Sequence, residues 1–161
     1  MRKIGALVRA ALAAAVLGGC SGGLLSDDGP GAGTFSGTWD GAAWNGRSYA
    51  VLHDDTMTVV GHRKDPQYYY DEYIQVQVAF TGPGTYAVSE SAGVLKKITG
   101  GDAGFFPPAA GTLVIRGYDA SAHTVAGQVT LRATSFQPAW DASGSFDAPV
   151  YSSFDQVPSS R

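Results

Sequence analysis

The chain has 161 residues, with 11 Lys and Arg, 14 Asp and Glu, and a net charge of −3 at neutral pH. This length fits one domain behind a targeting segment, and the acidic balance argues against a nucleic-acid-binding protein, whose expected footprint is a basic stripe. Glycine is abundant, at 22 residues, whereas the usual helix formers Glu, Lys and Leu are scarce, which is typical of a β-rich protein.

The first 19 residues have the layout of a secretory signal. Arg2 and Lys3 form a basic start, and residues 4–17 form an apolar stretch that Arg9 interrupts. This stretch is too short and too interrupted to remain in a bilayer as a transmembrane helix. We therefore expect an exported protein that loses this segment.

The end of the signal is its most specific part. Leu17-Gly18-Gly19-Cys20 resembles the lipobox of bacterial lipoproteins, in which a Leu and two small residues precede a Cys. The resemblance implies cleavage before Cys20, lipid on its thiol and acylation of the new amino terminus. The alternative is an ordinary signal peptide that leaves Cys20 as a free thiol. A lone Cys in an exported chain has no partner for an internal disulfide, which favours the modified Cys.

The lipobox predicts the location of the protein as well. We expect lipid anchoring to the cell envelope through Cys20. The residue after the Cys is Ser21 rather than Asp, which resembles lipoproteins sent to the outer membrane of Gram-negative bacteria. Membrane contact through Cys20 is thus one predicted partner interaction, and an envelope protein or glycan is another.

Removal of the signal leaves 142 residues, with eight basic residues against 14 acidic ones and a net charge of −6. That balance predicts a body that stays off anionic lipid except through its anchor. Residues 20–33 are Gly-rich and read as a flexible tether with a root-mean-square reach of about 20 Å. We expect a β-rich domain over 34–150 and a Ser- and Pro-rich tail over 151–161 that frays.

The processed chain reads as a series of short strands separated by turn signals. Asp40-Gly41 and Asp54-Asp55 are tight-turn signals, and residues 100–111 read as a long loop. The strand candidates are 34–39, 42–45, 48–53, 56–63, 72–80, 85–89, 94–98, 112–118, 124–134 and 143–149.

The strand pattern predicts one antiparallel domain of about eight or nine strands, either a β-sandwich or a barrel, and periodicity does not separate the two. Alternation is clearest around Ile74, with Gln75 and Gln77 on the wetter face. The residues expected to point inward are Leu52, Met57, Val59, Ile74, Val76, Val78, Leu113, Ile115, Val129 and Leu131.

Two stretches resemble small, uncharacterised bacterial lipoprotein domains. Residues 35–44, FSGTWDGAAW, are similar to their opening, where an aromatic strand runs into a D-G turn and a Trp. Residues 111–119, GTLVIRGYD, and 125–131, VAGQVTL, are similar to their later hairpin, although Val129 and Leu131 replace its aromatic residues. The resemblance implies a β-rich extracytoplasmic domain of unknown function and carries no catalytic residue.

One group of polar residues could bind a metal ion, and another could act as a pair of carboxylates. The expected strand geometry argues against both roles. With Asp54-Asp55 as the loop, His53 pairs with Thr56, and His62 pairs with Arg47 about 20 Å further along the ladder, so the two histidines cannot share an ion. Asp71 and Glu72 are neighbours on a strand and point to opposite faces, so they cannot act as an acid–base pair. We expect both carboxylates to be solvated and no metal to be bound.

Aromatic residues in two loops are the best binding candidates. Tyr68, Tyr69 and Tyr70, followed by Tyr73, can stack on sugars or grip a protein partner, because alternation turns at least one of the three outward. The alternative is that one packs inward and the others cover an edge strand. Phe105 and Phe106 can form an apolar lip over a pocket, or fold back and cap the core. Trp39, Trp44 and Trp140 are expected in the core or at its rim, since a Trp buries a large area.

The common enzyme motifs H-E-x-x-H, C-x-x-C and the P-loop do not occur in the sequence. We therefore predict no catalytic residue and no cofactor. The expected function is a non-enzymatic binding or interaction module at the cell envelope. A carrier of a small apolar ligand in a barrel cavity is the alternative, and a hydrolase with an unrecognised site is a third possibility.

Overall fold

The computed structural model describes residues 33–64, 71–98, 104–105, 107–135 and 138–158. Within them, all regular structure except one 3-10 turn (Phe154–Gln156) is β-strand, so the predicted all-β fold is confirmed. The strands are β1 (Gly33–Trp39), β2 (Ala42–His53), β3 (Thr56–Lys64), β4 (Asp71–Ala79), β5 (Gly84–Val88), β6 (Gly93–Ile98), β7 (Gly104–Phe105), β8 (Ala110–Asp119), β9 (Thr124–Ala133) and β10 (Trp140–Tyr151).

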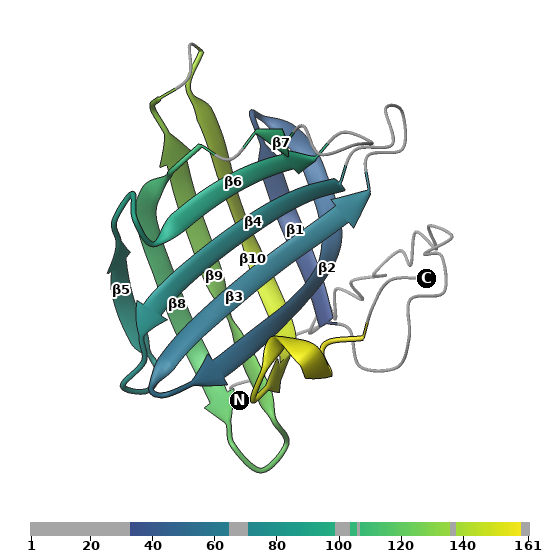
Figure 1. Ribbon diagram of the computed structural model, residues 1–161, viewed down its shortest axis with the longest axis vertical. Helices are drawn as coiled ribbons and strands as arrows, with labels where there is room; N and C mark the ends of the chain where they lie inside the picture. Colours follow the sequence, from purple (N-terminus) through teal and green to yellow (C-terminus); the bar gives the residue numbers. More distant parts are fainter. Residues whose placement is uncertain (1–32, 65–70, 99–103, 106, 136–137, 159–161) are drawn as a thin grey trace, which may run out of the picture.

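One sheet contains all these strands, in the order β5-β8-β9-β10-β1-β2-β3-β4-β6-β7. Its two ends approach each other, because the residues that lead into β8 run along β6. Val94 and Pro108 form an antiparallel bridge, and the amide of Ala109 donates to the carbonyl of Gly93 at 2.8 Å. The sheet is therefore a nearly closed barrel rather than a sandwich (Figure 1).

The short strand β1 lies between β10 and β2, and it begins beside the middle of β2. Gly33, its first residue, pairs with Ser48 of β2. Beyond that point β10 and β2 pair directly and in parallel, with Val150 opposite Ala50. The chain that precedes residue 33 therefore joins the barrel on the side of its wall, next to the middle of β2.

Two hairpins turn through the residues that the sequence predicted. Asp40 and Gly41 have φ of 49° and 76°, and Asp54 and Asp55 have φ of 46° and 59°. Two consecutive left-handed residues are what a two-residue hairpin loop requires, and Asp tolerates that region better than most residues. The loop fixes the register, so that His53 pairs with Thr56 as expected.

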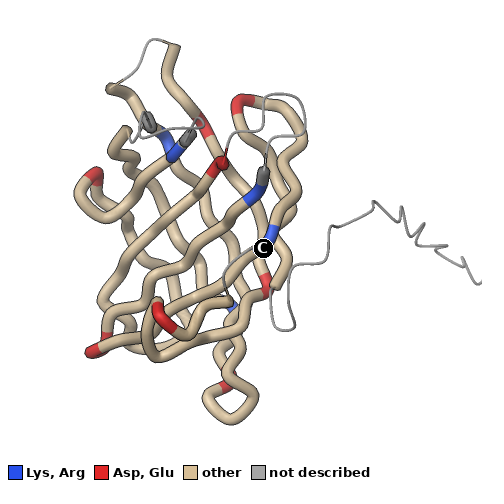
Figure 2. The backbone as a smooth tube through the Cα atoms, turned by 45° about the vertical axis from the view of Figure 1, so that its right-hand side comes forward, with Lys and Arg blue, Asp and Glu red and all other residues tan. Residues whose placement is uncertain are grey.

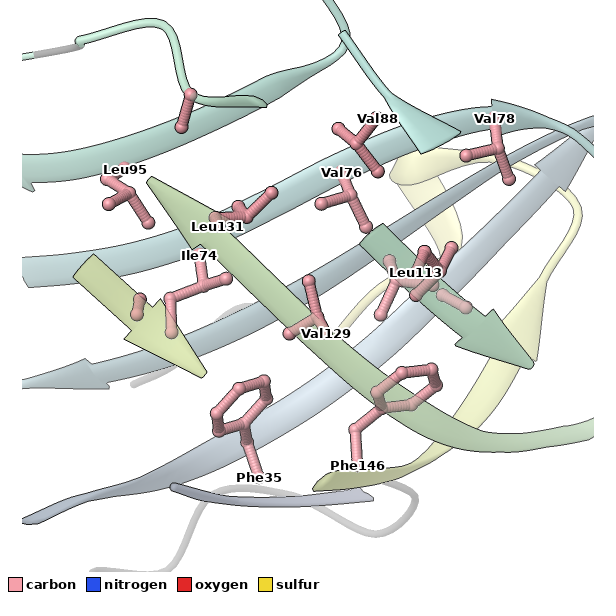
Figure 3. Packing of buried hydrophobic residues seen from close by; sticks show 14 of the residues in the cluster. Phe35, Ile74, Val76, Val78, Val88, Leu95, Leu113, Val129, Leu131 and Phe146 are labelled. Carbon is pink, nitrogen blue, oxygen red and sulfur yellow. The ribbon is translucent and has the colours of Figure 1, made fainter. Parts of the chain in front are cut away.

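Alternate residues of the strands fill the barrel (Figure 3). Of the ten residues predicted to point inward, nine are buried and Leu52 is partly buried against the core. On the opposite face of β4, Gln75 is half-buried and Gln77 is exposed, as predicted. Trp39 and Trp44 are buried and Trp140 is partly buried against them, which confirms their place in the core and at its rim.

Glycines make room for the aromatic rings in the barrel. A Cβ atom on Gly61 would lie 2.8 Å from the Phe35 ring, and one on Gly144 would lie 2.4 Å from the same ring. A Cβ atom on Gly127 would lie 2.7 Å from the ring of Phe146. The interior around both phenylalanines is therefore closely packed, with no space to spare for a methyl group.

Several predicted boundaries were wrong. Residues 42–53 form one strand instead of two, because Gly46 fits a close approach to the carbonyl of His62 without breaking the ladder. The expected loop over 100–111 contains the short strand β7. Pairing of β10 continues to Tyr151, and residues 154–156 form the 3-10 turn, so regular structure extends beyond the predicted domain end at 150.

Candidate functional site

Four residues form a row across the outer face of β2, β3, β4 and β6. The register places Arg47 opposite His62, His62 opposite Tyr73 and Tyr73 opposite Lys96. Each lies at a position that alternates with a residue of the core, so all four belong to the outside of the barrel. We call Arg47, His62, Tyr73 and Lys96 the outer row.

The centre of the outer row is an aromatic pair with a cation beside it. The rings of His62 and Tyr73 stack with centroids 4.6 Å apart and planes 21° from parallel. The ammonium nitrogen of Lys96 lies 5.3 Å from the centroid of the Tyr73 ring, within the range of a cation–π contact. His62 Nε2 lies 3.3 Å from Asp71 Oδ1, which fixes the imidazole from its other side. The aromatic faces are thus held in place before any partner arrives.

Two tyrosines of this face are held in their protonated form. Burial raises the pKa of Tyr73, and the charge of Asp71 and the neighbouring Tyr49 raise it further. Burial alone raises the pKa of Tyr49, which follows Arg47 by two residues on β2. Both phenols therefore remain neutral hydrogen-bonding groups over the physiological pH range.

The lower part of the same face is covered. Val51 and Val60 point away from the barrel core, yet they are only 2% and 1% exposed. Phe154 of the 3-10 turn lines a hollow of about 370 Å³ together with Val51 and Thr58. Phe154 therefore lies beside Val51 and Thr58 on the outer face of β2 and β3, and it remains 54% exposed.

A buried ionic network lies inside the barrel at the end where β3 and β4 are connected. One carboxylate oxygen of Glu72 accepts hydrogen bonds from the Trp44 indole at 2.8 Å and from Arg63 Nε at 2.7 Å. The Arg63 guanidinium lies 5.5 Å from the centroid of the Trp44 ring. Glu72 is 1% exposed, so the prediction that it is solvated was wrong. The predicted opposite orientation of Asp71 and Glu72 is confirmed, since Asp71 contacts His62 outside.

Five of the six residues predicted as lipidation or binding sites lie outside the described residues: Cys20, Tyr68, Tyr69, Tyr70 and Phe106. Phe105 lies in β7, where its backbone pairs with Lys97. The segment that carries the three tyrosines joins Lys64 to Asp71, so its ends are two residues from His62 and from Tyr73. The predicted tyrosine cluster and the outer row are therefore neighbours along the chain.

The predicted separation of the two histidines is confirmed. His53 lies at the Asp54-Asp55 turn with a side chain 73% exposed, and His62 lies opposite Arg47 in the outer row. In the part of the chain that the structure describes, no three His, Cys, Asp or Glu residues are grouped so that they could hold a metal ion.

A second hollow, of about 630 Å³, opens at the end of the barrel opposite the Glu72 network. Leu52, Tyr118, His123 and Tyr151 are among its lining residues. Tyr118 packs edge-on against Phe80, with centroids 5.0 Å apart, beside the barrel interior. This end of the barrel therefore offers a shallow surface of mixed aromatic and polar character.

Comparison of the chain with family models, with curated proteins and with solved structures found no match. Among the described residues, none belongs to a helix of the length and apolar character needed to cross a bilayer.

Proposed function

We propose that the protein is a lipid-anchored, extracytoplasmic binding module of the bacterial cell envelope, and that the outer row is its binding surface. The anchor in this proposal is lipid on Cys20, which the lipobox-like residues 17–20 support. The observation that carries the binding function is the stacked pair of His62 and Tyr73, with Lys96 beside it, on the outside of a closely packed barrel.

Surface binding is favoured over internal binding because of how the aromatic residues are distributed. The rings of Phe35 and Phe146 occupy the interior so tightly that neighbouring positions must be glycine. The rings of His62 and Tyr73 instead lie on the wall, half-buried and fixed by their neighbours. Rigid aromatic rings with adjacent polar groups are typical of residues that dominate binding energy.

The test is photo-crosslinking in cells. A photoreactive phenylalanine analogue replaces Gln75, which follows Tyr73 by two residues on the same face, and in a matched control it replaces Thr130, an exposed residue of β9. We expect adducts at position 75 that are absent at position 130 and that disappear when His62 and Tyr73 are changed to Ala. Equal adducts at the two positions, or none at position 75, would refute binding through the outer row.

A second candidate function is a carrier of a small apolar ligand, and the hollow of about 630 Å³ beside Leu52 and Tyr118 is the observation that favours it. Hollows of this volume are within the usual range of small-molecule sites. An apolar fluorescent dye should then bind saturably, with binding lost in Tyr118→Ala. Fluorescence that rises without saturation, or that is unchanged by the substitution, would remove this candidate.

A further inference from the structure

Basic residues of the barrel are concentrated on one set of strands. Seven Lys and Arg residues belong to the described residues, and five of these lie in β2, β3 and β6: Arg47, Arg63, Lys64, Lys96 and Lys97. The ten described acidic residues divide evenly: Asp40, Asp54, Asp55, Glu90 and Asp155 lie at turns, and Asp71, Glu72, Asp119, Asp141 and Asp147 lie in strands. Figure 2 shows the blue segments on the strands, and red segments both on strands and at turns.

Arg47 and Lys96 belong to the outer row and point away from the core, as the exposed Arg116 and Arg132 do on β8 and β9. Arg47 and Lys96 form its two ends, whereas Arg63 points inward and is paired with Glu72. The acidic residues near the row are Asp71, which contacts His62, and Asp147, which pairs with Thr34 on the far side of β1. The row is thus a convex strip with a cation at each end and aromatic rings between them.

The predicted tether joins the barrel beside this strip. Thr34 pairs with Arg47, so the row continues directly from the second residue of β1. Lys96 lies four strands from Thr34 in the sheet, which is about 19 Å at ~4.8 Å per strand. A Gly-rich tether of the predicted length would have a root-mean-square reach of about 20 Å, which is similar to the length of the strip.

We propose that the outer row docks on the anionic phospholipid headgroups of the membrane that holds the anchor. This inference rests on the proposed lipidation of Cys20 and names the partner of the proposed binding surface. Arg47 and Lys96 pair with headgroup phosphates, and the Tyr73 ring lies at the level of the headgroups, where amphipathic aromatic rings are favoured. A convex wall suits a planar array of headgroups better than a single molecule that needs a cleft.

The net charge of −6 for the processed chain predicts the opposite, namely repulsion from anionic lipid. The distribution of the charges reverses that expectation locally. The Debye length is about 8 Å at physiological ionic strength, so acidic turns at the barrel ends are screened from a surface that touches the outer row. Each Lys or Arg near an anionic surface favours contact about fivefold, and two of them favour it about 30-fold.

The experiment uses the chain from Cys20 onward, coupled through its only cysteine to a maleimide lipid in vesicles. One vesicle set contains phosphatidylglycerol with phosphatidylcholine, and the other contains phosphatidylcholine alone. A photoreactive phenylalanine analogue replaces Gln75 or, as the control position, Thr130. The readout is the fraction of protein that gains the mass of one phospholipid.

We expect lipid adducts at position 75 to exceed those at position 130 at least tenfold on anionic vesicles, and to fall at least fivefold on neutral vesicles. Arg47→Gln with Lys96→Gln should abolish the excess. Arg116→Gln with Arg132→Gln, the same change of charge on exposed residues of β8 and β9, should leave it intact.

Three results would overturn the inference. Equal adducts at positions 75 and 130 would mean that the tethered barrel has no preferred orientation. An excess of adducts at position 75 that persists on neutral vesicles would mean that charge on the outer row does not produce it. The same would follow if the excess falls equally in the outer-row double variant and in the control double variant of β8 and β9. Because the coupling to lipid is chemical, these results do not depend on natural lipidation. Adducts that form in cells only with protein or glycan would refute lipid as the partner while leaving the binding function intact.

Discussion

Glu72→Leu tests whether the buried network at the end of the barrel stabilises the fold. Leucine has a similar volume but removes the acceptor of two hydrogen bonds, from Trp44 and from Arg63. The Trp44 side chain is fully buried, so loss of its acceptor costs about 1–3 kcal/mol. A charge left without its buried partner costs about 3–5 kcal/mol, but Arg63 keeps 21% exposure, and we reduce its share to about 1–2 kcal/mol because water solvates it.

Together these losses amount to about 3 kcal/mol, which lowers the melting temperature of a domain of this size by roughly 10 °C. Urea and thermal unfolding followed by circular dichroism measure the change. Asp71→Asn is the matched control, because this neighbouring carboxylate is 43% exposed and its contact with His62 contributes less than about 1 kcal/mol.

A second variant keeps the test independent of general damage to the core. Changing Glu72 to Leu and Arg63 to Met together also removes the guanidinium that has lost its carboxylate, and should recover about 1 kcal/mol relative to Glu72→Leu alone. If Glu72→Leu is no more destabilising than Asp71→Asn, the buried network does not stabilise the fold. A double variant that is less stable than Glu72→Leu would also contradict a stabilising role for the network.

Three further outcomes follow from the geometry. Burial raises the pKa of Tyr49 and of Tyr73, so the stability that they contribute is complete below about pH 10 and is lost as pH rises through the raised values. Ultraviolet titration should show one late-ionising tyrosine fewer in Tyr73→Phe than in the wild-type protein, and an unchanged late phase would contradict this. Gly144→Ala should destabilise by about 1–3 kcal/mol in urea, whereas Gly117→Ala, which meets open space, should change stability by less than about 1 kcal/mol; equal effects would be inconsistent with the tight interior. Asp55→Gly should raise the urea midpoint by the equivalent of about 0.5–1 kcal/mol, since φ of 59° suits glycine, and a lower midpoint would argue against the hairpin geometry.

Alternation and turn chemistry were enough to predict most of the strands, although they divided β2 in two and missed β7. The pattern around Ile74 identified the inner face of β4, and Asp54-Asp55 gave the register that brings Arg47 opposite His62. Both signals are local, because strand period and a two-residue loop each depend on residues that are neighbours in the sequence.

The features that depend on contacts between distant strands could not be predicted from local sequence patterns. Barrel closure rests on Val94 and Pro108, and on β10 meeting β2 beyond the short strand β1. Burial of Glu72 depends on Trp44, which is 28 residues away and carries no signal of such a contact. An acidic residue at the start of a strand is ordinarily solvated, so the sequence pattern favoured the wrong environment.

Only part of the outer row could be predicted from the sequence, for the same reason. Tyr73 was noted with the three preceding tyrosines, and His62 was correctly placed opposite Arg47. Lys96 joins them only because β6 pairs with β4, and the intervening β5 pairs with β8 instead. Strand order, rather than local pattern, therefore assembles the surface.

Mass spectrometry of the amino-terminal peptide from the native protein is the decisive measurement for the proposed lipid anchor. This peptide should begin at Cys20 and carry a diacylglyceryl group on its sulfur, with an additional acyl chain on its amine. A peptide that still includes residues 1–19, or a Cys20 thiol without lipid, would contradict this anchor and would remove the membrane from which the binding surface is proposed to work.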